Sequence, residues 1–170
     1  PTANKIYLFK NGSNPGYSAA MTQSGGSVTA NGIQFGGDTG SHDATSSATL
    51  QLSGGSLLVG AQGITRGSAA SALPIAIQLL GGSLGASAAW SSPLDMKLGS
   101  ATIRAANSGG TAQNINLSGV LSDDVGAGTL TKTGSGTLTL SGTGDNTFTG
   151  ATLVSEGTLN LGKVNAVSSS

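Results

Sequence analysis

Cysteine is absent from the 170 residues of this chain, so the sequence offers no disulfide framework, no thiolate metal ligands and no catalytic thiol. Charged residues are scarce as well, at 8%, and the seven basic and seven acidic ones cancel. A nucleic-acid-binding surface needs clustered positive charge to neutralise phosphates, so we expect no nucleic-acid partner. No apolar run approaches the roughly 18 residues that cross a bilayer, so we expect no membrane insertion either.

Helix-forming segments are nearly missing too, because glycine and threonine interrupt almost every window of the sequence and both disfavour helix interiors. Glycine alone accounts for 29 residues, yet 36% of the chain is hydrophobic and proline occurs only four times. A disordered chain would be poorer in aliphatic residues and richer in proline or net charge. The composition therefore predicts a folded, repetitive all-β protein.

Short segments with alternating apolar residues predict strands that each bury one face. Examples are residues 47–52, 95–98, 114–117 and 137–140. Between the strands, a unit of glycine, then serine or threonine, then an aliphatic residue recurs. It starts at Gly26, Gly55, Gly82, Gly128, Gly136 and Gly157.

Most intervals between these units fall between about 17 and 29 residues, which is the repeat length of a solenoid. A coil of roughly 20 residues cannot bury its apolar face alone, so coils must stack and pair in parallel. We therefore expect a right-handed parallel β-helix of roughly seven to eight coils. An antiparallel sandwich is the alternative architecture.

Residues 129–163 carry a more specific pattern. It consists of Leu130, Lys132, Gly134, Gly136, Leu138, Leu140 and Gly142, then Asn146, Phe148 and Gly150, then Gly157, Leu159 and Leu161. The pattern resembles the autotransporter-associated β-strand repeat, also called the passenger-associated transport repeat. The resemblance implies a right-handed β-helix exported to the bacterial surface, where the repeat assists folding and transport. It implies no catalytic residues, and it leaves the first thirty or so residues unexplained.

The single histidine, His42, stands beside Ser41 and Asp43. A catalytic triad is assembled by the fold and not by adjacency in sequence. Because glycine, serine and aspartate crowd this segment, we expect His42 to lie in a solvated loop. A lone histidine is also a poor metal site.

Asp123 and Asp124 form the only acidic pair. On a strand their side chains would point to opposite faces, and in a turn both would be solvated. An enzymatic interpretation would need them to converge with Asp145 and a basic residue in one groove. The calcium-binding nonapeptide repeat does not occur. We therefore expect no enzyme, no metal and no cofactor.

Threonine pairs of the type Thr-x-Thr suggest an ice-binding solenoid as another hypothesis. They occur at Thr131/Thr133, Thr137/Thr139 and Thr147/Thr149. The pairs cluster near one end of the chain, and threonine is in any case a common outward-facing strand residue. A polysaccharide-active β-helix is a further hypothesis, for which the sequence holds few candidate groups.

The ends of a solenoid expose unpaired backbone groups that invite pairing with another chain. We expect residues 1–17 to form an apolar strand plus a tether, and residues 18–170 to form the β-helix. The strand either caps its own coil or stacks on a neighbouring molecule. The candidate assembly residues are Ile6, Tyr7, Leu8, Phe9, Leu159, Leu161 and Val164.

Head-to-tail contact between such ends does not close, so repeated contact yields a filament. The first functional hypothesis is therefore an extracellular structural protein that assembles with itself into filaments or a surface layer. The alternative is a fragment of an autotransporter-like adhesin passenger. Both hypotheses place the chain outside the cell, although its sequence shows no signal peptide.

Overall fold

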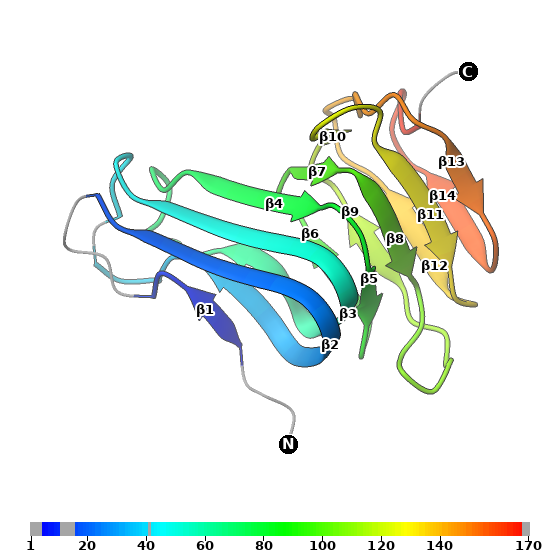
Figure 1. Ribbon diagram of the computed structural model, residues 1–170, viewed down its shortest axis with the longest axis horizontal. Helices are drawn as coiled ribbons and strands as arrows, with labels where there is room; N and C mark the ends of the chain where they lie inside the picture. Colours follow the sequence, from blue (N-terminus) through cyan, green and yellow to red (C-terminus); the bar gives the residue numbers. More distant parts are fainter. Residues whose placement is uncertain (1–4, 11–15, 41, 168–170) are drawn as a thin grey trace.

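The computed structural model describes residues 5–10, 16–40 and 42–167, and it confirms an all-β parallel solenoid (Figure 1). The strands are β1 (Ile6–Leu8), β2 (Ser18–Phe35), β3 (Ser47–Arg66), β4 (Ile75–Leu79), β5 (Ser83–Ala86), β6 (Trp90–Ser92), β7 (Met96–Leu98), β8 (Ser100–Arg104), β9 (Ile115–Leu117), β10 (Leu121–Asp123), β11 (Thr129–Thr133), β12 (Thr137–Leu140), β13 (Thr152–Val154) and β14 (Thr158–Leu161). All pairings between these strands are parallel. The described residues contain no helix, and hence none long and apolar enough to cross a membrane.

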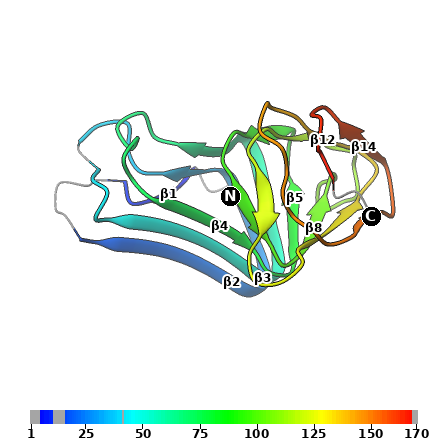
Figure 2. The ribbon, with the colours of Figure 1, turned by 90° about the horizontal axis from the view of Figure 1, so that it is seen from above.

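The strands stack in three columns around a common interior, as Figures 1 and 2 show. The first column contains the beginnings of β2 and β3, followed by β4, β7 and β10. The second contains the middle parts of β2 and β3, followed by β5, β8, β11 and β13. The third contains β1, the ends of β2 and β3, and then β6, β9, β12 and β14. β2 and β3 are long because each bends through the corners that separate the columns, with irregular register at the bends.

The solenoid has about five turns, so the expected seven to eight coils are wrong. The error lies in the coil length. Hydrogen bonds between neighbouring coils join residues that are 29 apart at Ser18–Ser47, 26 apart at Asp123–Thr149 and 23 apart at Asn114–Thr137. Coils are therefore longer than the roughly 20 residues assumed, most of all toward the N-terminus. The right-handed sense of the coil stays a prediction.

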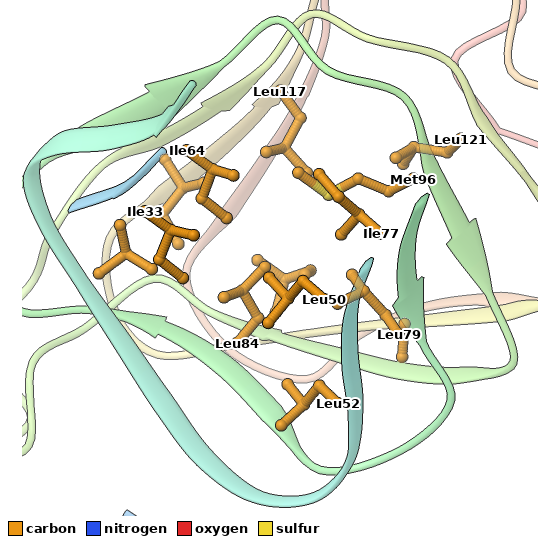
Figure 3. Packing of buried hydrophobic residues seen from close by; sticks show 14 of the residues in the cluster. Ile33, Leu50, Leu52, Ile64, Ile77, Leu79, Leu84, Met96, Leu117 and Leu121 are labelled. Carbon is orange, nitrogen blue, oxygen red and sulfur yellow. The ribbon is translucent and has the colours of Figure 1, made fainter. Parts of the chain in front are cut away.

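Aliphatic side chains fill the interior, as the alternating pattern predicts (Figure 3). Leu50 pairs in register with Ile77, and Leu52 pairs with Leu79 in the next coil. Each of these side chains is at most 1% exposed. Similar side chains stack from coil to coil, so each side chain is shielded from water by the coil before it and the coil after it. A single coil would leave both sides exposed.

Glycine at the first corner allows successive coils to approach closely. A β-carbon on Gly54 would lie 2.3 Å from the carbonyl oxygen of Ser24 in the preceding coil. Real β-carbons do not approach backbone that closely, so a larger residue would push the two coils apart. Gly25 lies at the same corner of the first coil, and a β-carbon there would meet nothing within 4 Å.

Replacing Gly54 with alanine is expected to lower the free energy of unfolding by about 1 to 2 kcal/mol, because two coils must shift to admit the methyl group. The matched change, Gly25→Ala, is expected to alter it by less than about 0.5 kcal/mol. Urea denaturation of both variants measures the two effects. Equal effects would show that close approach at this corner does not limit stability.

Candidate functional site in the C-terminal coils

Two polar side chains, Lys132 and Asn146, point into the otherwise aliphatic interior of the C-terminal coils. Lys132 lies on β11, in register with Ile103 of the preceding coil and Val154 of the following one. Its side chain is fully buried, and Asn146 is 8% exposed. Both residues belong to the pattern described for residues 129–163, where the sequence analysis assigned them no role.

The Lys132 ammonium group donates hydrogen bonds to three backbone carbonyls. Its Nζ lies 2.9 Å from the oxygen of Thr133, 2.6 Å from that of Gly134 and 2.8 Å from that of Glu156. These contacts match the three donors of an ammonium group. Burial lowers the pKa of Lys132, while the nearby Glu156 carboxylate opposes that shift. Because Glu156 belongs to the next coil, Lys132 joins the corners of two successive coils.

Asn146 joins three coils in a similar way. Its Oδ1 accepts hydrogen bonds from the backbone N–H of Leu121, at 2.9 Å, and from Nζ of Lys163, at 3.0 Å. Its Nδ2 donates to the carbonyl of Ala166 at 2.6 Å. Lys163 also donates to the carbonyl of Gly119 at 2.9 Å. The amide therefore connects the coil before it with the last described segment of the chain.

Lys163 is partly enclosed at this junction. Burial lowers the pKa of its ammonium group, and the carboxylates of Asp95 and Asp145 oppose the shift. The adjacent aromatic residue of the pattern, Phe148, is 2% exposed and lies in the core cluster. The junction thus combines a buried amide with a partly buried cation.

The glycines of the same pattern stand where neighbouring backbone leaves no room for a side chain. A β-carbon on Gly136 would lie 2.2 Å from the carbonyl oxygen of Gln113. One on Gly150 would lie 2.4 Å from that of Gly128. The pattern therefore has a physical explanation. Its aliphatic residues point inward, its glycines allow close approach at the corners, and its two polar side chains connect neighbouring coils.

The acidic pair does not form a joint site. Asp123 accepts hydrogen bonds from the backbone N–H of Gly128 at 2.7 Å and of Thr149 at 2.9 Å, and these bonds lower the pKa of its carboxyl group. Asp124 instead accepts from Nε2 of Gln78 at 3.0 Å. Asp145 accepts a hydrogen bond from Nδ2 of Asn165 at 2.8 Å. Each of the three carboxylates therefore has its own hydrogen-bond partner.

Among the residues that the structure describes, no group of three or more histidine and acidic side chains is placed to hold a metal ion. The threonine pairs likewise form no continuous ladder there. Thr131 pairs in register with Thr102 on one side and with Leu153 on the other. Thr139 has asparagines on both sides. The ice-binding hypothesis gains no support from this arrangement, and the polysaccharide hypothesis stays a prediction.

His42 is buried, at 4% exposure, so the expected solvated loop is wrong for this residue. Its ring contacts backbone groups of three different coils, at Phe9, Gly37 and Ala69. The neighbouring Ser41 lies outside the described residues. His42 does lie outside the strands, as its loop composition indicated, but backbone groups of neighbouring coils surround its ring.

The candidate assembly residues lie at opposite ends of the solenoid (Figure 1). β1 pairs with the end of β2 in the same chain, where Ile6 pairs with Ile33 and Leu8 with Phe35. Leu8 is 6% exposed, Tyr7 is 37% exposed, and Ile6 and Phe9 are partly buried. At the other end, Leu159 is partly buried. Leu161 and Val164 are 51% and 92% exposed.

The sequence contains a signal for the interior position of Lys132. Lys132 follows Leu130 by two residues in an alternating strand, so both side chains point to the same face. A lysine on the buried face of a strand must place its ammonium group against acceptors. No comparable signal marks Asn146, because it lies outside any strand. Its hydrogen-bond partners come close to it only when the coils stack.

Comparison with known families confirms the resemblance of the C-terminal region. Searches of curated proteins and of solved structures found no match. Residues 130–161 match the family described as the passenger-associated-transport-repeat. The buried Lys132 and Asn146 therefore lie within, and help to hold together, the part of this chain that is similar to that repeat.

Proposed function

We propose that this chain is a segment of the passenger of an autotransporter-like protein and serves as a stiff β-solenoid outside the cell. The observation that carries the proposal is the match of residues 130–161 to the passenger-associated-transport-repeat, on a parallel β-solenoid. That family suggests a secreted or cell-surface protein. A stacked solenoid suits a spacer, because its length grows with each coil while every coil supports the next.

Within this function, the repeat region would hold the last coils in register during and after export. Lys132 joins two coils through carbonyl contacts, and Asn146 joins three through its amide. Coil-to-coil contacts are the dominant stabilising interactions of a solenoid, since each coil touches only its neighbours. We further propose a structural role without catalysis, because Asp123 and Asp124 are engaged in separate turn and coil contacts.

The test is export and surface display of the chain in place of the natural passenger of a laboratory autotransporter. Antibody labelling and protease accessibility on intact cells measure display. The wild-type chain is expected to reach the surface, and the Lys132→Met/Asn146→Ala variant is expected to be displayed several-fold less, because its last coils open.

The matched control is Lys97→Met/Asn160→Ala, which changes the same residue types at exposed positions. It is expected to be displayed like the wild type. Retention of the wild-type chain inside the cell would contradict the passenger function. Normal display of the core variant would contradict the role assigned to the two buried residues.

Self-assembly is the second candidate, favoured by exposed apolar residues on the last coil. Leu153, Val154, Leu161 and Val164 are 58%, 45%, 51% and 92% exposed. Against head-to-tail filaments stands the difference in coil length between the two ends, because unequal coils do not continue one another's columns. Electron microscopy of the purified chain decides the matter. Filaments that grow with protein concentration would favour assembly, and monomers would exclude it.

A further inference from the structure

The first column of strands ends in an open edge at β2. Residues 18–23 of β2 pair with β3 in regular register on one side. On the other side, β1 pairs only with Ile33–Phe35, at the far end of the same strand. No further strand that the structure describes pairs with β2, and Figures 1 and 2 show its first part as the outermost ribbon. The outward backbone groups of residues 18–23 therefore have no partner strand in the described part of the chain.

This edge lacks the features that ordinarily keep an edge strand from pairing with another chain. Such features are charged side chains, proline, bulges and short length. Residues 16–37 include no charged residue and no proline, and residues 18–23 pair without a shift in register. The edge at the other end differs, because β13 and β14 are three and four residues long and Glu156 and Lys163 flank them. The β2 edge is therefore the one suited to accept a strand.

Two side chains on the core side of this segment are incompletely covered. Met21 is only partly buried, whereas Leu50, its register partner on β3, is fully buried. Gln23 is 5% exposed, and its Oε1 is buried without a hydrogen-bond donor among the described residues. A buried acceptor without a donor is costly. A strand placed against the edge would cover Met21 and bring a donor to Gln23.

We propose that the N-terminal face of the solenoid joins a second copy of this chain through a two-fold axis at β2. Such an axis sets the two β2 strands antiparallel, and it closes at two subunits. It also joins first coil to first coil, so the difference in coil length that opposes head-to-tail stacking does not arise. Because the segment carries no charge, the two copies do not repel each other there. The dimer is independent of the passenger function.

The backbone of β2 determines which residues pair across the axis. The N–H of Ser47 donates to the carbonyl of Tyr17. Since successive residues of a strand direct their backbone groups to opposite sides, those of residues 18, 20 and 22 face away from β3. Antiparallel pairing centred on Ala20 sets Ala20 opposite its counterpart and Ser18 opposite Thr22. This register uses the whole regular segment.

The same register brings complementary side chains together on the core side. Tyr17 of one copy stands opposite Gln23 of the other, and Ala19 stands opposite Met21. Tyr17 is 58% exposed, and its hydroxyl group is a donor that suits the Oε1 of Gln23. The axis exchanges the columns on either side of the first, so β1 of one copy lies over residues 27–30 of the other. The structure shows these residues paired only with β3.

Analytical ultracentrifugation of the purified chain tests the dimer. With rising concentration, the wild-type chain is expected to pass from monomer to dimer without larger species. Ala20→Lys sets two ammonium groups opposite each other at the axis, and we expect it to raise the dissociation constant at least about tenfold. Ala20→Asp is expected to do the same. An equimolar mixture of the two variants is expected to regain the dimer, because opposite charges then meet.

Thr49→Lys is the matched control, because Thr49 lies in register with Ala20 on the next coil and away from the edge; it should dimerise like the wild type. Tyr17→Phe removes only the exposed hydroxyl group and is expected to raise the dissociation constant about three- to tenfold. Ala20 is exposed, so its variants should keep the fold, which circular dichroism checks.

A wild-type chain that stays monomeric at every concentration overturns the proposal, and so does one that grows into filaments. The two-fold axis is wrong if Ala20→Lys dimerises as tightly as the wild type. It is also wrong if the mixture of Ala20→Lys and Ala20→Asp stays monomeric.

Discussion

Replacing Lys132 with methionine is expected to lower the free energy of unfolding by about 3 kcal/mol. Methionine retains much of the volume of lysine but donates no hydrogen bond. The carbonyls of Gly134 and Glu156 therefore lose the Lys132 donor, whereas that of Thr133 keeps its hydrogen bond from the Ala105 N–H. Leaving a buried acceptor without a partner costs about 1 to 3 kcal/mol. Relief from burying the charge offsets part of this loss. The net effect is expected to be destabilising because two acceptors lose the Lys132 donor and a third loses one of its two donors.

Urea denaturation measures this loss, and hydrogen exchange locates it. Protection is expected to fall mainly in residues 150–161, since Glu156 is held by Lys132 from the preceding coil. Lys97→Met is the matched control, because Lys97 is exposed on β7; it is expected to change stability by less than about 0.5 kcal/mol. A Lys132→Met protein as stable as the wild type would mean that the buried charge costs as much as its hydrogen bonds contribute.

Replacing Asn146 with alanine is expected to lower the free energy of unfolding by about 2 to 3 kcal/mol. The backbone N–H of Leu121 and the carbonyl of Ala166 both lose their partner, and Lys163 loses one acceptor. Each unsatisfied buried group costs about 1 to 3 kcal/mol, and local rearrangement recovers some of this. The effect should be largest in the segment around Ala166, whose carbonyl accepts its hydrogen bond from the Asn146 side chain.

Asn160→Ala provides the comparison, because Asn160 is an asparagine on the exposed side of β14. Thermal and urea unfolding of the two alanine variants, together with exchange at Leu121, separate the buried from the exposed position. If both variants lose the same small amount of stability, Asn146 does not connect the coils. If the Leu121 amide keeps its protection in Asn146→Ala, its hydrogen bond to the Asn146 side chain is not what protects it from exchange.

Alternation in the sequence predicted most of the interior correctly. Leu50, Leu52, Leu98 and Leu117 are all inward and at most 1% exposed. This part was readable because the side-chain period of a strand is two, whatever the strand pairs with. The motif in residues 129–163 was equally readable, because its spacing reflects one coil and its corners.

The coil count could not be read with the same certainty, because corner loops do not carry a periodic pattern. The turn between β8 and β9, residues 105–114, and the loops after Phe35 and Arg66 lengthen their coils without altering the alternation inside the strands. Stacking tolerates such loops, since they project from the corners and leave the columns in register. A period estimated from strands and glycine units alone therefore comes out too short.

Burial of polar residues was the other part that only the stacked structure decided. His42 has a loop composition, yet loops of neighbouring coils enclose it. Asn146 lies outside any strand, and its partners Leu121 and Ala166 are distant in sequence. The sequence by itself determined which faces of the strands are apolar, because that follows from local alternation. Which polar groups become enclosed was decided by the stacking of coils, because a hydrogen bond between coils joins residues that the chain separates by a whole turn.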